Sequence, residues 1–392
     1  MKSYDVIIVG GGASGLMCAI YAGNKGLSVL VLEKNQKAGM KILVSGGGRC
    51  NFTNVWADPR EHYISQNPQF CISAMRRYSP SDFIELVEKH GIAYHEKALG
   101  QQFCDESSKL IQGMLLAECE LAGVDIRLNS EVLTINNRSD IFDVELDRES
   151  YSASKVVLAC GGLSLPKIAS DLAFSVAKNF DLEVVPPRAG LVPLTWNSGD
   201  KPFYESLSGI SFFGEARCNN YSFTEGILFT HRGLSGPAIL QISSFWKESD
   251  SVYLNCLPNI NVLDWLIEER DARPKQRLST LLKSQLPKRF IDKVTGTWFE
   301  DTRVGSISTK QLTSVAECFT NWEFRPGGSE GYRTAEVTLG GISTDGFSSQ
   351  TFECNTVPGL HVIGEAIDVS GWLGGYNFQW AWASAYCCAD HL

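Results

Sequence analysis

The first part of the chain has the hydrophobic pattern of a strand, a glycine turn, a helix and a second strand. Apolar residues run almost continuously over 5–9 and 28–32, and they recur at helical spacing over 13–25. Short continuous apolar runs are typical of parallel strands that are buried on both faces. The pattern therefore predicts a βαβ unit at the start of the chain.

Strands and helices continue to alternate to about residue 162, and the strand pattern returns after residue 335. Helices are expected over 81–90, 110–122 and 378–389. Strands are expected over 125–128, 132–136, 142–146, 155–159 and 359–364. The predicted class is α/β, and the C-terminal segment is expected to complete the domain that the N-terminus begins.

The middle of the chain has a different character. Pro186 and Pro187 lead into short segments of alternating hydrophobicity, whereas the pattern farther on is helical, with breaks at Pro274 and Pro287. Four parts are predicted. Residues 1–188 and 336–392 are expected to form the two parts of a Rossmann-like domain. Between them, residues 189–260 with 318–335 are expected to form a β-rich insert, and residues 261–317 a helical subdomain.

Composition and charge narrow the classes of partner. The 392 residues are 44% hydrophobic and 20% charged, which is typical of globular proteins and excludes a disordered chain. The formal net charge is −9, so no overall positive field attracts phosphates, and nucleic acid is not expected as a partner. A membrane is not expected either, because no apolar run approaches the roughly 20 residues that span a bilayer.

The N-terminal apolar segment is too short for a signal peptide, so we expect a cytoplasmic protein. Twelve cysteines are scattered over the chain without a C-x-x-C pair, which favours reduced thiols. The adjacent Cys387 and Cys388 are more simply explained as packed thiols than as a vicinal disulfide. The histidines and cysteines show no ligand spacing, and no metal site is predicted.

A dinucleotide-binding motif lies in the predicted βαβ unit. Gly10-x-Gly12-x-x-Gly15 stands between the strand and the helix, where backbone N–H groups and a helix N-terminus can meet a pyrophosphate. Glu33 ends the second strand, 18 residues after Gly15, where a carboxylate can accept ribose hydroxyls. This order of a strand, a glycine turn, a helix, a second strand and an acidic residue favours a dinucleotide-binding site over an ordinary tight turn.

Two further glycine clusters decide between cofactors, because the first motif alone does not separate NAD from FAD. The run from Ser45 to Asn51 holds three glycines and is too long for a simple β-turn, so its backbone can approach a flat ring. Near the C-terminus, Gly374-Gly375-Tyr376-Asn377 opens the last helix, whose first N–H groups can face a developing negative charge. A reduced flavin carries such charge on its pyrimidine ring.

Several of these strings together resemble the BaiN/YhiN-like family of FAD-dependent oxidoreductases. They are the segments 5–15, 41–54, 229–231 with 233–237, and 374–377, and the resemblance runs over nearly the whole chain. It implies a Rossmann-like fold of the two-dinucleotide-binding-domain flavoprotein type, with an inserted β-barrel-like and helical portion.

The resemblance also implies roles for residues. Gly10, Gly12, Gly15 and Glu33 would hold the ADP half of FAD, residues 45–48 would line the isoalloxazine ring, Glu365 would take the ribityl hydroxyls, and residues 375–377 would contact the pyrimidine edge. The full expected cofactor set is Gly10, Gly12, Ala13, Ser14, Gly15, Glu33, Lys34, Lys41, Ser45, Gly46, Gly47, Gly48, Arg49, Cys50, Asn51, Gly161, Gly364, Glu365, Gly374, Gly375, Tyr376 and Asn377.

The chain departs from the family pattern at three places. They are residues 100–104, residues 167–171, and Trp372-Leu373 before the last glycine cluster. The first two lie where contacts with substrate or with the flavin edge are plausible, whereas the indole of Trp372 either narrows the cavity or merely packs. The substrate of a relative therefore does not transfer safely to this chain.

Catalytic residues are harder to identify, because flavin N5 itself exchanges hydride and the protein manages one proton. The candidates are His231, Tyr376 and Cys50, although a lone histidine is more often structural and Cys50 is more often a packed thiol. Arg49 is interpreted as a ligand-binding residue, for a pyrophosphate or an anionic substrate.

The predicted function is an FAD-dependent oxidoreductase that transfers hydride between flavin N5 and a small organic substrate, with NAD(P)H as a possible electron donor. One alternative is an NAD-linked dehydrogenase that uses only the first motif, which leaves the later glycine clusters without a purpose. A second alternative is a flavin-binding sensor, or an RNA-associated protein whose flavin is structural, although the acidic net charge argues against a large nucleic-acid surface. The sequence leaves the substrate and the direction of the reaction open.

Overall fold

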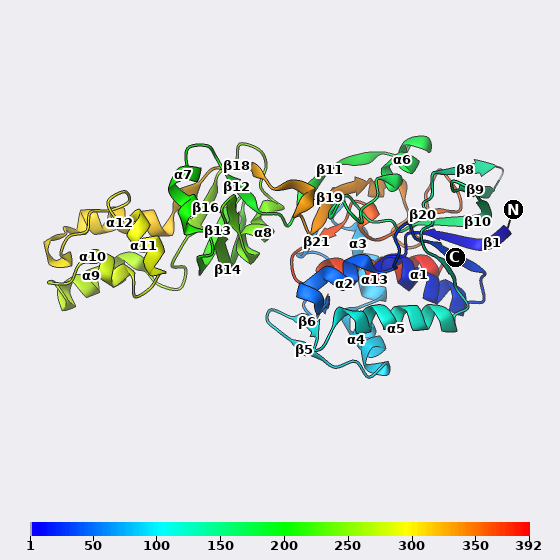
Figure 1. Cartoon of the computed structure of the whole chain (residues 1–392), viewed down its shortest axis with the longest axis horizontal. Coiled ribbons are helices and arrows are strands. Elements are labelled where there is room, and N and C mark those ends of the chain that lie inside the picture. Colours follow the sequence, from blue (N-terminus) through cyan, green and yellow to red (C-terminus); the bar gives the residue numbers. More distant parts are fainter. Residues whose placement is uncertain (1, 139) are drawn as a thin grey trace. The chain divides into compact units, whose positions relative to one another are not determined.

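The computed structural model describes residues 2–138 and 140–392, which fold as two compact units. Unit 1 consists of Met1–Arg188 and Val337–Leu392, and unit 2 consists of Ala189–Glu336. In Figure 1 the blue N-terminal and red C-terminal segments are interleaved within unit 1. Unit 2 is therefore an insertion into a fold that both ends of the chain build.

The main sheet of unit 1 has seven strands in the order β7-β2-β1-β10-β9-β8, with β20 also paired to β10. Their bounds are β1 (Lys2–Val9), β2 (Val29–Leu32), β7 (Asp125–Arg127), β8 (Thr134–Arg138), β9 (Ile141–Glu145), β10 (Ser150–Leu158) and β20 (Leu360–Val362). Strands β7, β2, β1, β10 and β20 are parallel, whereas β8 and β9 form an antiparallel extension.

This strand order creates a crevice. From β1 the chain crosses to β2 on one side, and β10 lies on the other side, so the order reverses at β1. In open parallel sheets, ligands bind outside the carboxyl ends of the strands at such a point. The glycine turn after β1, Glu33 after β2, Gly161 after β10 and Gly364 after β20 all follow carboxyl ends.

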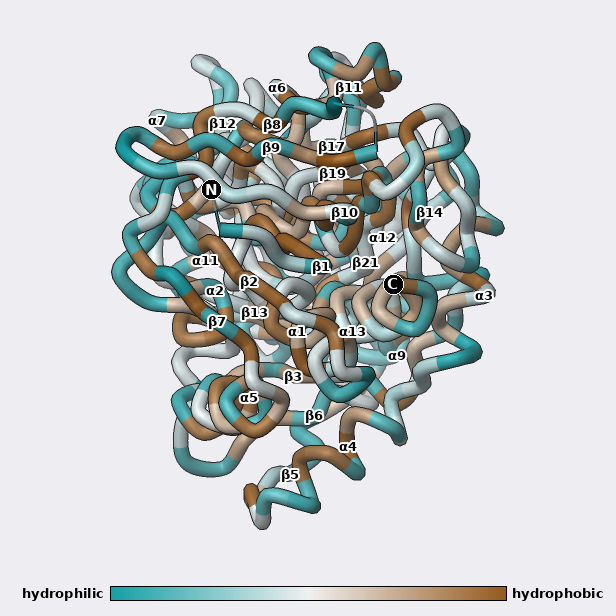
Figure 2. The backbone as a smooth tube through the Cα atoms, turned by 90° about the vertical axis from the view of Figure 1, so that its right-hand side faces the viewer, coloured by the Kyte–Doolittle hydropathy of each residue, from teal (hydrophilic) through white to brown (hydrophobic). Residues whose placement is uncertain are grey.

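Helices cover this sheet and bury a hydrophobic core. They are α1 (Ala13–Asn24), α2 (Met40–Val44), α3 (Phe70–Arg77), α4 (Pro80–Lys89), α5 (Ser108–Leu121), α6 (Leu172–Asn179) and α13 (Tyr376–Ala389). Helix α1 packs against α13 and α5, and Figure 2 shows hydrophobic colour along β2 and α1. Trp380 and Trp382 on α13 are fully buried, as expected of core residues, and Trp382 stacks on Phe83 at 4.2 Å between ring centroids.

Three small sheets and three short 3-10 helices complete unit 1 and its connections. The sheets are β3 (Asn51–Asn54) with β6 (Gln101–Cys104) and β5 (Tyr94–Glu96), β4 (Tyr63–Ile64) with β21 (Ser370–Gly371), and β11 (Val184–Gly190) with β19 (Val337–Ile342). The 3-10 helices are η1 (Ser45–Gly48), η5 (Thr344–Gly346) and η6 (Gly364–Ala366).

Unit 2 contains a seven-stranded antiparallel sheet in the order β17-β16-β13-β14-β15-β12-β18. The strands are β12 (Leu194–Trp196), β13 (Ser211–Cys218), β14 (Tyr221–Phe229), β15 (Gly233–Ser235), β16 (Val252–Asn255), β17 (Trp322–Phe324) and β18 (Pro326–Ser329). The two edge strands β17 and β18 are joined by the single residue Arg325. The two Cα–Cα steps from Phe324 to Pro326 span at most about 7 Å, so the sheet must curl until its edges approach, which makes it barrel-like.

The helices of unit 2 lie mostly between β16 and β17 in the sequence. They are α7 (Lys201–Tyr204), α8 (Pro237–Ser243), α9 (Val262–Ala272), α10 (Leu278–Leu282), α11 (Lys288–Val294) and α12 (Thr309–Thr320), with the 3-10 helices η2 (Glu205–Leu207), η3 (Val304–Ser306) and η4 (Gly331–Arg333). Figure 1 shows α9 to α12 grouped together. Among residues 2–138 and 140–392, no helix is long and apolar enough to cross a membrane.

The structure confirms the Rossmann-like α/β fold with an inserted antiparallel sheet, and it differs from the sequence-based expectation in detail. Residues 51–54 form a buried strand although the segment is polar and lies in a stretch without strand pattern. Pro186 and Pro187, where the pattern of the sequence changes, lie inside β11. The sheet β11–β19 has only two strands, so both are edge strands, where proline is tolerated.

Because His361 is buried in the middle of β20, we expect the folded protein to become less stable in acid. His361 is 1% exposed, and its Nδ1 lies 3.1 Å from the Thr351 carbonyl oxygen. Burial lowers the pKa of His361 to about 4. The unfolded chain binds a proton below about pH 6.5 whereas the folded chain does not, so stability falls as the pH drops from about 6.5 toward 4, by about 2 kcal/mol between pH 7 and pH 5.

Urea unfolding at pH 7 and pH 5 checks this, with His361→Gln as the comparison. The variant should lose less stability than the wild type over that interval, because its side chain does not titrate. An equal loss in both proteins would show that His361 does not cause the acid sensitivity.

Candidate functional site

The glycine turn after β1 is tightly packed on one side and open on the other. A Cβ on Gly10 (φ 108°) would lie 2.5 Å from the Ala159 carbonyl oxygen, and one on Gly15 would lie 1.9 Å from the Gly10 carbonyl oxygen. By contrast, a Cβ on Gly12, the N-cap of α1, would meet no protein atom within 4 Å. Gly10 and Gly15 therefore close the turn, while Gly12 leaves open space at the start of α1, where Ala13 is partly exposed and Ser14 is buried.

Glu33 is held next to this turn. Its side chain is buried, and Oε2 accepts a hydrogen bond from the Gly11 N–H at 2.8 Å. Oε1 accepts from the backbone N–H and the side-chain amide of Asn35 at 2.8 and 2.7 Å. The neighbouring Lys34 donates to the Ala169 carbonyl oxygen. The carboxylate is thus fixed at the end of β2, where the ribose of a dinucleotide is recognised.

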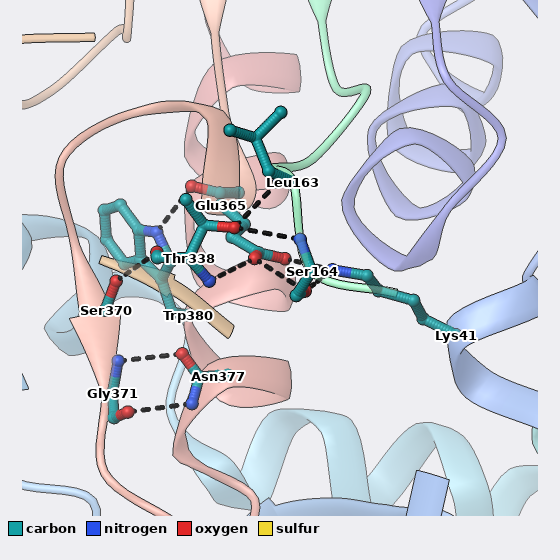
Figure 3. Close-up of polar contacts among 10 residues, drawn as sticks. Lys41, Leu163, Ser164, Thr338, Glu365, Ser370, Gly371, Asn377 and Trp380 are labelled. Atoms are coloured by element: carbon teal, nitrogen blue, oxygen red, sulfur yellow. Dashed lines mark hydrogen bonds and ion pairs between the residues drawn. The ribbon is translucent and has the colours of Figure 1, made fainter. Parts of the chain in front are cut away.

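A second acidic residue, Glu365, lies in a network of hydrogen bonds (Figure 3). Its Oε2 is paired with the ammonium of Lys41 at 2.6 Å, and Lys41 also donates to Ser164 Oγ at 2.7 Å. Its Oε1 accepts from the Thr338 N–H at 2.8 Å. The hydroxyl oxygen of Thr338 accepts from the N–H groups of Leu163 and Ser164. Glu365 therefore joins four segments that are far apart in the sequence.

Small residues next to Glu365 leave space beside the carboxylate. A Cβ on Gly161 (φ 72°) would come no closer than 3.9 Å to a protein atom, namely Glu365 Oε2. The left-handed Gly364, which precedes Glu365, is fixed by Trp380, whose indole donates to its carbonyl oxygen at 2.9 Å. The core helix α13 thus positions the turn that carries Glu365.

The glycine run after α2 is a left-handed loop. Gly46, Gly47 and Gly48 have φ angles of 56°, 66° and 87°. A Cβ on Gly46 would clash with the Asn51 nitrogen, whereas Gly47 and Gly48 face open space. Ser45 ties the start of the loop to α2 by donating to the Ile42 carbonyl oxygen at 2.8 Å. The loop therefore offers backbone alone to a flat ligand.

The two residues after this loop have opposite environments. Arg49 is exposed, which leaves its guanidinium accessible to a ligand. Cys50 is buried, and burial raises the pKa of its thiol to about 12. A thiol with that pKa remains protonated at neutral pH and is a poor nucleophile. This environment favours a packing role for Cys50.

The start of α13 closes the other end of the site. Gly375 (φ 95°) lies against β3, where a Cβ would be 2.4 Å from the Thr53 carbonyl oxygen, and Asn54 donates to the Gly374 carbonyl oxygen at 2.8 Å. The side chain of Asn377 accepts from the Gly371 N–H and donates to the Gly371 carbonyl oxygen, both at 2.8 Å (Figure 3). Asn377 thus uses its amide to brace the loop before the helix. The N–H groups of the first helical turn have no acceptor within the helix and can serve a ligand.

An aromatic cluster at this helix start was not expected from the sequence. The ring of His62 stacks on Tyr376 with centroids 4.7 Å apart and an interplanar angle of 20°, and Trp372 meets His62 edge-on at 4.9 Å. The Asp58 N–H donates to His62 Nδ1 at 3.1 Å, which leaves the proton of the neutral ring on Nε2. Burial lowers the pKa of His62.

His62 is placed by a pairing that no local pattern reveals. Strand β4 follows it and pairs with β21, so that Gly371 lies opposite Tyr63, and the Trp372 N–H donates to the His62 carbonyl oxygen at 3.0 Å. Asp368 anchors the same segment by accepting from the Gln66 N–H at 2.8 Å. These contacts join residues about 300 positions apart.

The expected cofactor residues lie in unit 1, after the carboxyl ends of β1, β2, β10 and β20, along α2 and the loop that leads from it to β3, and at the start of α13. His231 is the exception among the predicted site residues, because it is exposed in the turn between β14 and β15 of unit 2. Over residues 2–138 and 140–392, no group of three or more histidine, cysteine, aspartate or glutamate side chains is placed to hold a metal ion.

These residues fit FAD. The open N-terminus of α1 suits a pyrophosphate, the buried Glu33 suits an adenosine ribose, and the exposed backbone of Gly47 and Gly48 suits a planar ring. The start of α13 supplies N–H donors toward a ring that gains negative charge on reduction.

Comparisons with known proteins agree with this geometry. The family model described as the HI0933-like protein Rossmann domain matches residues 4–391. The chain is 47% identical over 402 residues to the ribosomal RNA dihydrouridine synthase of Escherichia coli strain K12, covering 100% of this chain and 98% of the relative. It is 46% identical to the enzyme of the same name from Haemophilus influenzae, covering 99% and 98%.

A more distant relative has a different substrate. The chain is 26% identical over 423 residues to the 3-dehydro-bile acid delta(4,6)-reductase of Clostridium scindens, covering 97% of this chain and 96% of the relative. Because full-length relatives are named for ribosomal RNA, the expectation from net charge that nucleic acid is not a partner is wrong. The chain belongs to the HI0933-like family, and it is an FAD-dependent oxidoreductase.

Proposed function

We propose that this protein reduces uridine to dihydrouridine in ribosomal RNA. The observation that carries the proposal is the identity of 47% and 46% over essentially the whole chain with two enzymes named ribosomal RNA dihydrouridine synthase. The candidate site in unit 1 supplies the cofactor chemistry that such a reduction needs.

The bile acid reductase supports the same reaction class on another substrate. Its name describes reduction of carbon–carbon double bonds near a 3-keto group. In uracil, the C5=C6 bond is likewise conjugated with the C4 carbonyl. Reduction adds a hydride to C6 and a proton to C5, and the two electrons of the hydride come from the reduced cofactor. FAD supplies this hydride from N5 when it is bound and reduced.

The protein's own residues bind the cofactor and orient it. In this proposal, the turn with Gly10, Gly12 and Gly15 and the carboxylate of Glu33 hold the ADP half of FAD. The left-handed loop over 45–48 would face the flavin ring, Glu365 would bind the ribityl hydroxyls, and the first N–H groups of α13 would stabilise negative charge on the pyrimidine ring.

We assign to His62 the role of hydrogen-bond donor to the carbonyl oxygen of the substrate. The Nδ1 of His62 accepts from Asp58, so Nε2 carries a donor hydrogen next to Tyr376 and the start of α13. A donor aimed at the C4 carbonyl oxygen stabilises the negative charge that develops there when hydride adds to C6. The lowered pKa keeps the ring neutral at neutral pH.

Lys41→Met tests the assignment around Glu365. Loss of the 2.6 Å pair leaves the Glu365 carboxylate without its cation and held at Oε1 alone, so FAD affinity should fall on the order of tenfold. Flavin titration monitored by fluorescence measures this. Lys89→Met is the matched control, because Lys89 forms a similar pair with Glu118 at 2.8 Å elsewhere in unit 1. This variant should bind FAD as the wild type does.

The proposed activity is tested with ribosomal RNA transcribed in vitro, which contains no dihydrouridine. The FAD-loaded protein is incubated with this RNA and with NADH or NADPH, which we propose as electron donors, and the RNA is digested and analysed by mass spectrometry of its nucleosides. Dihydrouridine above the enzyme-free control supports the proposal. Bleaching of the flavin by a donor without dihydrouridine in any ribosomal RNA would refute it.

A further inference from the structure

The negative charge of this protein is unevenly distributed. Although the whole chain carries −9, residues 273–310 contain nine lysines and arginines and only three aspartates and glutamates. This segment includes α10, α11 and η3 of unit 2. A local positive field of this kind attracts polyanions even when the net charge of the protein repels them.

A shallow groove of about 440 Å³ lies between this segment and strand β13. We call it the Phe213 groove. The residues that the argument uses from its lining are Ser211, Phe213, Lys283, Gln285, Pro287 and Lys288. The groove therefore combines an aromatic ring, polar side chains and two lysines on a single face of unit 2.

Phe213 is exposed although the neighbouring core is rich in aromatic rings. Successive strand residues face opposite sides, and Phe212 packs inward on Phe290 with ring centroids 5.6 Å apart. Phe213 consequently faces outward, where 52% of it is exposed. Its partner on β14 is Gly226, which has no side chain to cover the ring.

Two lysines line the groove, and two further cations lie on the helix that follows it. Lys283 is paired with Asp292 at 2.5 Å, whereas Lys288 is exposed at the start of α11. Arg289 follows it and donates to the Ser206 carbonyl oxygen at 2.7 Å, and Lys293, one turn later, lies 4.6 Å from the ring of Phe203. Helix α11 thus gathers three cations against the single carboxylate of Asp292.

We propose that the Phe213 groove binds a single-stranded segment of RNA, with a base stacked on Phe213 and the sugar–phosphate backbone next to Lys288 and its neighbouring cations. Exposed aromatic rings beside positive charge are the features by which proteins hold single strands, since every base has a stacking face. The inference rests on the proposed function in that it names the surface that docks the RNA substrate. It assigns to unit 2 the binding of RNA outside the flavin site.

Binding of the FAD-loaded full-length protein to a fluorescein-labelled single-stranded fragment of ribosomal RNA tests this, by fluorescence anisotropy over a range of salt concentrations. Phe213→Ala should raise the Kd about five- to tenfold with an unchanged salt slope, because stacking is lost while the phosphates stay neutralised. Lys288→Ala should raise the Kd and make the salt slope shallower by roughly 0.7 for each phosphate that the protein no longer neutralises.

Two matched variants control for general effects in unit 2. Tyr253→Ala removes another exposed aromatic ring of the same sheet, and Lys310→Ala removes another exposed cation of the same basic segment, but neither residue lines the groove. Both should bind RNA as the wild type does. Equal affinity of all variants, or no RNA binding by the wild type, would overturn the inference.

The outcome is independent of the proposed reaction. If the wild type, Phe213→Ala and Lys288→Ala all form dihydrouridine in ribosomal RNA with the same KM for the RNA, the groove is not the docking surface, but the proposed reaction stands. If binding depends on the groove but no dihydrouridine forms, the RNA-binding site stands and the proposed reaction fails.

Discussion

Gly12→Val is expected to remove FAD from the protein while leaving unit 1 folded. Gly12 has an extended backbone (φ −82°, ψ −167°), which valine adopts without strain, and a Cβ there meets no protein atom within 4 Å. The added methyl groups would instead occupy the space at the start of α1 where the pyrophosphate binds. Affinity for FAD should fall on the order of 100-fold, corresponding to about 3 kcal/mol.

The measurement is the flavin content of the purified protein together with its thermal unfolding. Gly113→Val is the control, because Gly113 on α5 is also exposed to open space but lies outside the site. It should retain FAD. If Gly12→Val kept a full complement of FAD, the cofactor would not lie at this turn.

His62→Phe has the largest effect that we expect on turnover. Phenylalanine keeps a ring stacked on Tyr376, where the centroids of the wild-type rings are 4.7 Å apart, but it has no donor for a substrate carbonyl. Removal of one donor to a developing oxyanion typically lowers kcat by at least about 100-fold. The FAD content and the KM for RNA should stay close to those of the wild type.

His95→Phe is the comparison for this variant. His95 on β5 is exposed and pairs with Asp105 at 2.6 Å, so its replacement should leave kcat unchanged. If His62→Phe turned over RNA at the wild-type rate, another group would stabilise the carbonyl. An increase in KM with kcat unchanged would assign His62 to substrate binding alone.

The dinucleotide turn could be predicted because its chemistry is local. Gly10, Gly12, Gly15 and Glu33 lie within one βαβ unit, so their spacing along the sequence identifies them, although the close contact that requires Gly10 is with Ala159, directly after β10. The α/β class followed from the apolar runs for the same reason, since parallel strands buried on both faces must be apolar along their length.

Strand β3 could not be found this way, because its polar residues are buried with partners from distant segments. Thr53 donates to Gln379 on α13 at 2.6 Å, and Asn54 donates to Gly374. Hydrogen bonds of this kind make burial of a polar strand possible, but they join positions more than 300 residues apart. His62 was missed for the same reason, since its stacking on Tyr376 requires the folded chain.

The exclusion of nucleic acid failed because net charge is an average. The acidic remainder of the chain outweighs the basic residues of 273–310, whose field acts over only about 8 Å at physiological salt. A local count along the sequence would have shown the basic segment, whereas its combination with the exposed Phe213 exists only in the folded unit.

The central claim is that electrons pass from the flavin of this protein to uridine in ribosomal RNA, and an anaerobic single turnover tests it most directly. The FAD-loaded protein is photoreduced without NAD(P)H and mixed with ribosomal RNA transcribed in vitro, while flavin absorbance is followed and dihydrouridine is counted. We predict that the flavin is reoxidised and that one dihydrouridine forms for each flavin oxidised. A flavin that stays reduced in the presence of this RNA would contradict the claim and favour a structural or sensory cofactor.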